Sequence, residues 1–561
     1  MASFVVKCLD CDAHTPYHPL IISCPECGSE WMEACYDLDV AKLWGAALAN
    51  RPDSLWRYSE LLPLQNPSLY PSIGEGWTPL YPAHQLGMLL GLPNLFIKDE
   101  RQNPTGSFKD RQAAVTAAAL LEHDISEAVI CSTGNVAIAF SAAFARTGLK
   151  LWAFITSLVP PEKMREVAIY GSQVIKITGT YDQAKQLAAQ FSLERELYLD
   201  RGVRSITALE SMKTIAFEIA EQLPRLQQSN STETEIPGTW RSPDWYIQAV
   251  SGAIGPLGVL KGFQEMHSAG LVDNIPALAC IQCTGCAPMA KAWEAGLDFV
   301  DPVLSPKTHI TTLTTGDPGR AYTLLRQRML DAGGGTIDHV SDEDAFRALS
   351  LVAKVEGLSI EPAAAVAFAG LIKLARQGVI KPEDVIVVNC SGHTMPVESR
   401  LLGPVWSKDV SIDDFALPDH PREGIVAALT QIDHSQMHNV LIIDDQADAR
   451  RLIRRLLEAQ GTFLVEEAES GPTALQLVKQ SIPDLIILDL MMPEMDGFAL
   501  LDRLHAQMPT RDIPVVVVTA KELTNSEWRR LDGHIERLMT KGDFFVDELI
   551  EEIEEALRQE R

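Results

Sequence analysis

The chain has few positive charges for its length and no apolar run long enough to cross a bilayer. Its 561 residues hold 48 lysines and arginines against 75 aspartates and glutamates, a formal net charge of −27. This charge argues against a nucleic-acid-binding face or an anionic membrane surface as the main partner. No membrane-spanning helix is expected, since such a helix needs about 20 apolar residues. A secretory charged-then-apolar pattern is also missing at the start, so we expect a cytoplasmic protein.

Internal repeats of fixed period and low-complexity tracts are absent too. In the cytoplasm the 10 cysteines are expected to be thiols or metal ligands, not disulfides. What remains is the composition of an ordinary globular protein, 46% hydrophobic and 22% charged. A chain of this length exceeds what one hydrophobic core supports, so three or more structural units are expected.

Strand-like runs alternate with helical stretches in two separate regions, which predicts two α/β domains. The simplest division is a turn-rich, cysteine-bearing module over 1–40, an α/β catalytic domain over 55–402, a linker over 403–436 and a smaller α/β domain over 437–561. Within these units we expect a surface insertion over 225–242, a short helix over 424–432 and an acidic amphipathic helix over 546–561.

Two cysteine pairs lie near the start of the chain, Cys8-x-x-Cys11 and Cys24-x-x-Cys27. Pairs at this spacing deliver four thiolates tetrahedrally to Zn²⁺, and the short gap between them suits a zinc ribbon. Four cysteines leave no open coordination position, so the metal would be structural; the alternative is four free thiols. Three further cysteines have no fourth partner nearby and are interpreted as core or loop residues: Cys280, Cys283 and Cys286.

Lys109 stands in a turn that joins a strand-like run to an alanine-rich segment. The turn is Asn103-Pro-Thr-Gly-Ser-Phe-Lys-Asp-Arg111, and Gln112 to Leu121 is typical of a buried helix. A lysine beside such apolar surface is desolvated, which lowers its pKa and leaves a neutral amine able to form a Schiff base. Taken alone, a surface lysine whose stem covers apolar neighbours is the simpler interpretation.

Three further segments place polar groups at the ends of expected strands. Cys131-Ser-Thr-Gly-Asn-Val-Ala137 offers hydroxyls and the Asn135 amide to a carboxylate or a ring oxygen. The glycine loop Val250 to Gly258, before a helix expected to begin near Leu257, suits a phosphate dianion. Ser391 ends another strand with a hydroxyl that can meet a ring nitrogen. Together with the lysine, these groups match what pyridoxal phosphate needs.

From Cys8 to about Pro396 the chain resembles threonine synthase, one of the tryptophan-synthase-β-like, fold-type II pyridoxal-phosphate enzymes, which have two α/β subdomains. The matching stretches are the cysteine pairs, Leu55-Trp-Arg-Tyr58, Gly74-Glu-Gly-Trp-Thr-Pro-Leu80, Ile97-Lys-Asp-Glu100, Asn103 to Arg111, Ser132-Thr-Gly-Asn135, Gly252 to Pro256, Glu361-Pro-Ala-Ala364 and Ser391-Gly-His393. The resemblance implies Lys109 as the Schiff-base lysine and α-carbon base, Asn135 as the ring-oxygen partner and Ser391 as the pyridine-nitrogen partner. The phosphate loop that it implies consists of Gly252, Ala253, Ile254, Gly255 and Pro256.

The reaction implied by this resemblance converts O-phosphohomoserine and water to threonine and phosphate. Two segments depart from the family pattern. Ser205-Ile-Thr-Ala208 replaces an Asn-Pro-Tyr-Arg run, with Arg201 and Arg204 slightly upstream, and Thr311 to Pro318 differs from the usual Gly-Asn-Pro loop. Losing an arginine at a phosphate-binding position would weaken selection of a phosphorylated substrate. A dehydratase or a cysteate-synthase-like activity therefore stays open.

Acidic residues end two expected strands of the C-terminal domain. Asp444 and Asp445 follow Asn439-Val-Leu-Ile-Ile, and Asp489 follows Asp484-Leu-Ile-Ile-Leu. Because the carboxyl ends of parallel strands meet at one edge of a sheet, the three acids are expected to converge. Three acids there would bind Mg²⁺ and make Asp489 a candidate phosphoryl acceptor. The alternative is three solvated acids at strand ends.

The run Asp489-Leu-Met-Met-Pro-Glu-Met-Asp-Gly497 resembles a response-regulator receiver domain, and the similarity spans Asn439 to about Leu557. It implies a doubly wound, flavodoxin-like fold with Asp489 as the phosphosite. The other residues that it implies are Asp444 and Asp445 as metal ligands, with Asp445 and Asp489 on the magnesium ion, and Thr519 and Lys541 as phosphate partners. Leu538 stands where receiver domains often carry an aromatic switch residue.

The sequence thus predicts an α/β protein with a zinc-ribbon-like module, a threonine-synthase-like lyase and a phosphorylatable receiver that tunes or localises it. The expected partners are a small amino-acid substrate, a histidine kinase or phosphotransfer protein and a second copy of the chain in a homodimer. The alternative from a different class is a catalytically idle cofactor-binding scaffold whose receiver domain supplies signalling.

Overall fold

The computed structural model describes residues 4–132, 134–156, 166–177, 181–228, 240–332, 334–393, 438–458, 463–506, 510–519, 523–531, 535, 537–540, 553, 556 and 557. The expected linker over 403–436 with its short helix, most of the acidic helix expected over 546–561, and Lys541 lie outside this part of the chain. None of the helices described in it is both long and apolar enough to cross a membrane.

The chain begins with a small antiparallel sheet in the order β2-β1-β3, and short helical turns follow it. The strands are β1 (Phe4–Cys8), β2 (His14–Thr15) and β3 (Met32–Tyr36). The turns are η1 (Leu38–Leu43), α1 (Trp44–Ala47), η2 (Leu48–Asn50), η3 (Leu55–Leu61) and η4 (Pro67–Leu69). The buried core of the antiparallel sheet holds only a few side chains, so this N-terminal unit has little apolar area of its own.

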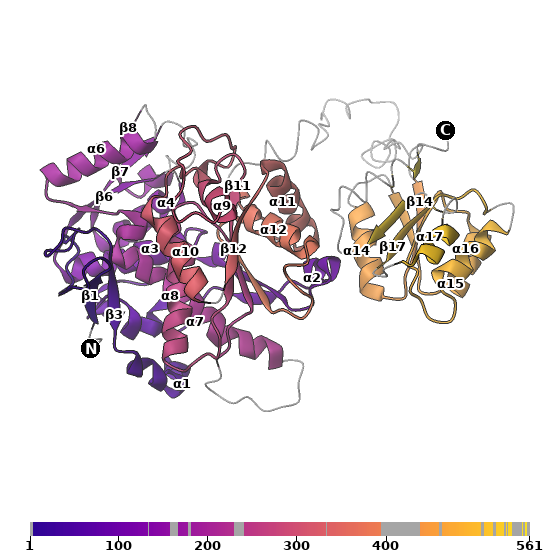
Figure 1. Cartoon of the computed structure of the whole chain (residues 1–561), viewed down its shortest axis with the longest axis horizontal. Coiled ribbons are helices and arrows are strands. Elements are labelled where there is room, and N and C mark those ends of the chain that lie inside the picture. The colour runs from indigo at the N-terminus through magenta and orange to yellow at the C-terminus, as the bar shows by residue number, and fades with distance from the viewer. Residues whose placement is uncertain are drawn as a thin grey trace, which may run out of the picture.

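A six-stranded sheet forms the centre of the larger α/β unit (Figure 1). Its order is β12-β11-β10-β13-β5-β4, parallel except for β4 against β5. The strands are β4 (Leu80–Pro82), β5 (Leu95–Asp99), β10 (Trp245–Ala249), β11 (Ala277–Cys283), β12 (Gly335–Val340) and β13 (Ile386–Cys390). Cys280, Cys283 and Cys286 are buried on or just after β11, which confirms them as core cysteines.

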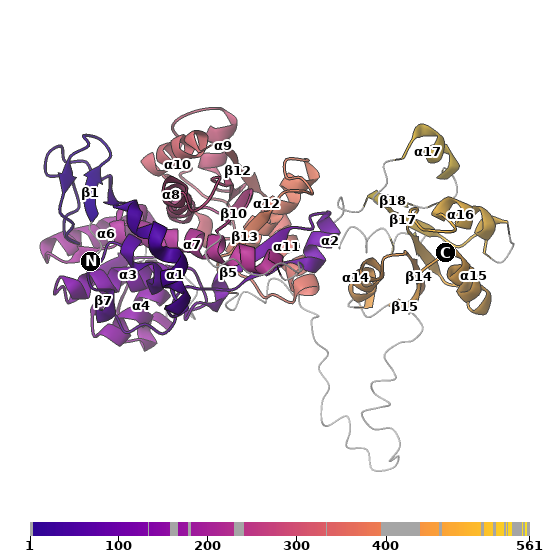
Figure 2. The ribbon, with the colours of Figure 1, turned by 90° about the horizontal axis from the view of Figure 1, so that it is seen from below.

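Helices cover both faces of this sheet because its strands are apolar on both sides. The face that includes Ile247 packs on α2 (His84–Leu90), α11 (Asp342–Glu356) and α12 (Pro362–Arg376). The face that includes Tyr246 packs on α7 (Ile206–Gln228), α8 (Ile254–Ser268), α9 (Pro288–Glu294) and α10 (Arg320–Asp331). Figure 2 shows these layers from another side.

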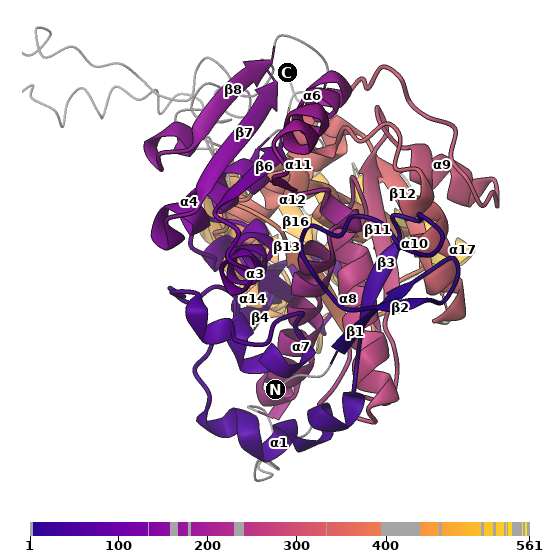
Figure 3. The ribbon, with the colours of Figure 1, turned by 90° about the vertical axis from the view of Figure 1, so that its left-hand side faces the viewer.

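A second, parallel sheet of four strands forms the smaller α/β unit, in the order β8-β7-β6-β9 (Figure 3). Its strands are β6 (Glu127–Cys131), β7 (Lys150–Thr156), β8 (Gln173–Ile177) and β9 (Tyr198–Leu199), and its helices are α3 (Lys109–Glu122), α4 (Asn135–Thr147) and α6 (Tyr181–Glu194). Short 3₁₀ turns complete the two units: η5 (Glu100–Gln102), η6 (Gly202–Arg204) and η7 (Thr311–Leu313). The expected alanine-rich helix over Gln112 to Leu121 is confirmed, and it starts at Lys109.

Two glycines of α8 allow it to pack directly against α7. A Cβ atom at Gly258 would lie 2.4 Å from the Cβ of Met212, and one at Gly262 would lie 2.9 Å from the Cβ of Ala216. Such separations are too short for non-bonded carbons, so a larger residue would force the helices apart. This close packing fixes the start of α8, which forms one wall of the site described below.

A fully buried ion cluster fastens the start of α3 to α7 and β5. Arg111 pairs with Glu100 and Glu218, and Lys98 pairs with Glu218 at 2.7 Å. Burial alone would raise the pKa of Glu218, but Arg111 and Lys98 outweigh it and hold this pKa at about 2. Two cations balance two carboxylates, so removing one partner would leave a buried charge at a cost of about 3–5 kcal/mol. Lys109, two residues before Arg111, is therefore held in a fixed place.

The C-terminal domain is a parallel five-stranded sheet in the order β15-β14-β16-β17-β18. Its strands are β14 (His438–Ile443), β15 (Phe463–Ala468), β16 (Leu485–Leu488), β17 (Val515–Thr519) and β18 (Arg537–Thr540), and its helices are α14 (Ala447–Glu458), α15 (Gly471–Gln480), α16 (Gly497–His505) and α17 (Asn525–Leu531). The strand order reverses beside β14, as in a doubly wound fold, and this confirms the expected architecture.

Two expectations about element boundaries were wrong. The helix after the glycine loop begins at Ile254 rather than near Leu257, because Pro256 is tolerated in the first turn of a helix. The region 225–242 is not simply a surface insertion. Its first four residues continue α7, while Trp240 stacks on Trp44 with ring centroids 5.7 Å apart.

Candidate active site

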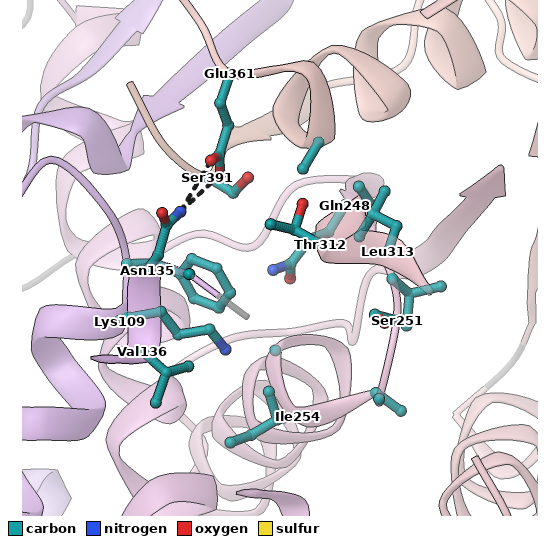
Figure 4. Close-up of a pocket in the computed structure, with 18 of the residues that line it drawn as sticks. Lys109, Asn135, Val136, Gln248, Ser251, Ile254, Thr312, Leu313, Glu361 and Ser391 are labelled. Atoms are coloured by element: carbon teal, nitrogen blue, oxygen red, sulfur yellow. Dashed lines mark hydrogen bonds between the residues drawn. The ribbon is translucent and has the colours of Figure 1, made fainter. Parts of the chain in front are cut away.

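A cavity of about 130 Å³ lies where strands of the two α/β units end (Figure 4). Loops after β10, β13 and β6 contribute Ser251, Ser391 and Ser132 to its lining. Lys109 lines it from the start of α3, and Glu361 from the residue before α12. Together with Thr312 and Leu313, side chains from six parts of the sequence therefore meet in one place.

Lys109, a partly exposed residue, extends its amine into this cavity (Figure 4). Burial lowers the pKa of this lysine to about 8, although the carboxylates of Asp200 and Glu361 act to raise it. The turn before it is held by the Phe108 N–H, which donates to the Ser391 carbonyl at 3.1 Å. Nζ of Lys109 lies 4.1 Å from the centroid of the Phe108 ring. The arrangement presents a reactive amine in a fixed position.

Asn135 at the start of α4 and Glu361 just before α12 point toward each other at one side of the cavity (Figure 4). The Asn135 amide donates to both carboxylate oxygens of Glu361, at 2.9 and 3.1 Å. The backbone N–H of Glu361 donates to the carbonyl of Gly392 at 3.0 Å, next to Ser391. Asn135, expected to meet a ring oxygen, and the segment of Ser391, expected to meet a ring nitrogen, are thus connected through one residue, Glu361. Sequence reasoning quoted Glu361 in a motif but gave it no role.

The loop from Gly252 to Pro256 forms the opposite wall of the cavity. Ala253 has a left-handed φ of +66°, which turns the chain sharply into the first turn of α8. The N–H groups at such a helix start lack intrahelical acceptors, and the helix dipole adds partial positive charge. The hydroxyls of Ser251 and Thr315, 2.6 Å apart, lie beside the loop. This is a suitable cradle for a phosphate dianion.

The described residues fit pyridoxal phosphate. The Lys109 amine, the Asn135 amide, the Gly252–Pro256 loop and the Ser391 hydroxyl all line the same cavity. Amine, anion cradle and ring partners are the groups that this cofactor's aldehyde, phosphate and pyridine ring need.

Arg201 and Arg204 do not line this cavity. Together with Tyr198, they line a separate one of about 20 Å³ between the cysteine module and the smaller α/β unit. Arg201 donates to the Ile22 carbonyl at 2.9 Å, and Arg204 pairs with Glu30. The two arginines therefore hold the module, and neither replaces the arginine missing from the run before α7.

Asp200 and Gln112 were missed by sequence reasoning. Asp200 follows β9, and the Gln112 amide donates to its Oδ2 atom at 3.0 Å. Gln112 lies one helical turn after Lys109 on α3. The available signal was an acid directly after a short apolar strand, a weak pattern by itself.

The four N-terminal cysteines converge as expected. Their sulfur atoms all lie within 4.8 Å of one another, with Cys8–Cys27 at 3.6 Å and Cys11–Cys24 at 3.7 Å. A tetrahedral zinc site with Zn–S bonds of about 2.3 Å separates its sulfurs by about 3.8 Å. The backbone N–H groups of Asp10 and Cys11 outweigh burial and bring the pKa of the Cys8 thiol to about 7. The donor set and its spacing fit Zn²⁺.

The three acids of the C-terminal domain also converge. Carboxylate oxygens of Asp444, Asp445 and Asp489 lie within 4.8 Å of one another at the ends of β14 and β16. Asp444 and Asp489 are buried and Asp445 is exposed. Thr519 is buried at the end of β17, and β18 ends directly before Lys541. Clustered carboxylates with one exposed member suit Mg²⁺.

Comparisons with known proteins agree with the assignments of both the larger α/β region and the C-terminal domain. Residues 71–392 match the family model of pyridoxal-phosphate-dependent enzymes, and residues 440–554 match the response regulator receiver domain. A threonine synthase of Methanosarcina acetivorans is 31% identical over 391 residues, which cover 70% of this chain and 91% of that protein. A threonine synthase of Methanocaldococcus jannaschii is 33% identical over 390 residues, 69% of this chain and 91% of its own length.

A solved structure adds a likeness of fold. Diaminopropionate ammonia lyase from Escherichia coli aligns with a TM-score of 0.50 and 15% identity, covering 60% of this chain and 90% of that one.

Proposed function

Because the chain belongs to the pyridoxal-phosphate-dependent enzymes, with threonine synthases among its relatives, and ends in a response regulator receiver domain, we propose that it makes threonine and phosphate from O-phosphohomoserine and water. The observation that carries this proposal is the cavity in which Lys109, Asn135, the Gly252–Pro256 loop and Ser391 meet. The similarity to threonine synthases over most of their length supports the reaction.

In this proposal the groups that line the cavity have different roles. The N–H groups of the Gly252–Pro256 loop bind the cofactor phosphate, while Asn135 and Ser391 orient its ring. When bound, pyridoxal phosphate supplies an electron sink for negative charge at the substrate α-carbon. Lys109 Nζ would hold the cofactor aldehyde, and the same amine would take and return the proton at the substrate α-carbon. Its pKa of about 8 keeps a useful fraction neutral near physiological pH.

Product analysis on the purified full-length protein tests the reaction. With O-phosphohomoserine we expect equal amounts of threonine and inorganic phosphate, detected by chromatography and a phosphate assay. Ammonia from serine or threonine without phosphate release would instead support a dehydratase. The two substrates must be compared because none of the described arginines lines the cavity to bind a substrate phosphate. Arg201 and Arg204 contact the cysteine module instead. If neither substrate reacts, a cysteate-synthase-like activity and a cofactor-binding scaffold are the two alternatives left.

We further propose that the receiver domain accepts a phosphoryl group on Asp489 from a histidine kinase or phosphotransfer protein. Mg²⁺ held by Asp445 and Asp489, with Asp444 beside them, would offset the charge of the transferred group. Thr519 at the end of β17 and Lys541 after β18 would bind its oxygens. The convergence of the three acids supports this role.

We also propose that the cysteine module binds one Zn²⁺ through Cys8, Cys11, Cys24 and Cys27. We expect about one zinc per purified chain, released by a thiol reagent and measured with a metal-sensitive dye. Cys24→Ser should lose the metal and lower the unfolding midpoint, because the module has little core of its own. Cys35→Ser, in the same module but outside the cluster, should keep it. Zinc retained by Cys24→Ser would contradict the site.

A further inference from the structure

The side-chain amide of Gln248 is buried, and one of its two ends has no hydrogen-bond partner. Gln248 lies on β10, is 2% exposed and lines the cavity that holds Lys109 (Figure 4). Its Oε1 atom accepts a hydrogen bond from the Tyr246 hydroxyl at 3.0 Å. Within the described part of the chain, its Nε2 atom donates to no group. A buried donor without an acceptor costs free energy, so an acceptor bound in the cavity would stabilise it.

Two neighbouring side chains hold this amide in place. Tyr246 and Gln248 are two residues apart on β10, so they point to the same face of the sheet. Asn389 lies on β13, the strand paired with β10. Its amide donates to the Tyr246 hydroxyl at 2.6 Å, and the same hydroxyl donates to Gln248. Because Tyr246 and Asn389 are both buried, this chain of hydrogen bonds fixes the direction of the Gln248 amide.

The amide of Gln248 lies against the Gly252–Pro256 loop. A Cβ atom at Gly255 would lie 2.4 Å from Nε2 and 2.8 Å from Oε1 of Gln248. These separations leave no room for a side chain at position 255, so glycine there allows the amide to reach the loop. The free donor of Gln248 is therefore beside the start of α8, where backbone N–H groups form the anion cradle.

We propose that Gln248 is a cofactor-binding residue whose Nε2 atom donates to the phosphate of pyridoxal phosphate. In this proposal Tyr246 is a positioning residue that turns the amide toward the loop. The inference rests on the assignment of this cavity to the cofactor. Lys109 is the cation among the described residues that line the cavity, and it is assigned to the aldehyde. The phosphate is then left to the backbone N–H groups and to neutral side-chain donors such as Gln248.

A bound phosphate also favours the direction in which the amide points. If the amides of Gln248 and Asn389 both turned over, Tyr246 would accept from Nε2, and Oε1 would face the cavity. A carbonyl oxygen beside a phosphate dianion is repelled, whereas an N–H group forms a charge-assisted hydrogen bond with it. The anion therefore stabilises the direction that the structure shows, with Nε2 toward the cavity.

The test compares pyridoxal phosphate with pyridoxal, which carries a hydroxyl in place of the phosphate. The full-length chain is freed of cofactor and titrated with each compound, and the absorbance of the bound compound gives its dissociation constant. Gln248→Met keeps the length of the side chain but removes the donor. Since a hydrogen bond to a charged group contributes at least about tenfold to an affinity, this variant should bind pyridoxal phosphate at least ~10-fold more weakly. Its dissociation constant for pyridoxal should stay that of the parent chain.

Two further variants complete the test. Gln327→Met makes the same exchange at an exposed position of α10 and should change neither dissociation constant. Tyr246→Phe removes the hydroxyl that holds Oε1, so the Gln248 amide can turn. A smaller loss of affinity, again confined to pyridoxal phosphate, is expected. Circular dichroism checks that each variant is folded, and Tyr246→Phe decides the matter if Gln248→Met is not.

An unchanged ratio of the two dissociation constants in folded Gln248→Met would overturn the proposal, whether neither constant moves or both move equally. Where Gln248→Met does not fold, an unchanged ratio in Tyr246→Phe would overturn it. The parent chain tests the cofactor assignment separately. If the parent binds pyridoxal phosphate no more tightly than pyridoxal, the assignment of the cavity fails, and the role of Gln248 fails with it.

Discussion

Replacing Lys109 with alanine is expected to abolish turnover and the visible absorbance of covalently held pyridoxal phosphate. The side chain supplies both the covalent attachment point and the base at the substrate α-carbon in the proposed reaction. A positioned base alone contributes about 10²–10⁴-fold, so we expect a loss of at least ~10³-fold in kcat/KM. Absorbance spectra and threonine release from O-phosphohomoserine measure the two effects. Lys291→Ala, on the exposed side of α9, should keep both.

The same variant should not weaken the fold. The pKa of Lys109 is lowered from 10.5 to about 8, because burial disfavours its charged form. Between these two pH values the unfolded chain binds more protons than the folded chain, so this lysine makes the free energy of unfolding rise with pH. Lys109→Ala should lose that rise and be at least as stable as the parent at pH 7. A variant that unfolds at pH 7 would contradict the expected cost of burying the amine.

Replacing Asp489 with asparagine is expected to abolish phosphorylation of the chain by a small acyl phosphate. The buried Asp489 carboxylate lies with Asp444 and Asp445 at the ends of β14 and β16, where Mg²⁺ can bridge an acid and a phosphoryl group. An amide keeps the shape but can neither accept the phosphoryl group nor hold the metal with a full charge. Phosphate-affinity electrophoresis after incubation with acetyl phosphate and Mg²⁺ measures the modified fraction.

Asp512→Asn is the matched control, because Asp512 is exposed and lies outside the acidic cluster. It should be phosphorylated like the parent chain, and removal of Mg²⁺ by a chelator should stop the reaction in both. Phosphorylation that persists in Asp489→Asn would place the phosphosite elsewhere. Turnover of O-phosphohomoserine measured with and without the acyl phosphate then shows whether the receiver controls the enzyme. Any effect on turnover should be absent in Asp489→Asn.

Local signals in the sequence predicted most of the elements that carry the site. The turn after Leu95-Phe-Ile predicted that Lys109 stands at a junction before a helix over Gln112 to Leu121, and α3 begins at Lys109 itself. The glycine loop after Trp245–Ala249 predicted a helix N-terminus, although the start lies three residues earlier than expected. Such predictions succeed because strand patterning, turn residues and helix starts depend on neighbours in the sequence.

Long-range features escaped sequence reasoning. Asp200 and Gln112 are 88 residues apart, and no local pattern indicates that they meet. Trp240 looked like part of a polar insertion, but it stacks on Trp44, almost 200 positions earlier in the chain. Arg201 and Arg204 stood near a phosphate-binding position in the sequence, yet the fold turns both toward the cysteine module. The direction in which a side chain points at a loop depends on what packs around it.

The sequence by itself determined the chemistry that this protein carries: the lysine, the glycine loop, the cysteine pairs and the acidic strand ends. Residue type and local spacing are enough for that, because each cysteine pair, loop and strand end is a short run of neighbouring residues. Only the tertiary structure decided which groups share a cavity and which charges act on Lys109. Burial and electrostatic interactions depend on distances in space, and parallel sheets join segments that are far apart in the chain. The lysine's proton affinity is therefore a property of the fold.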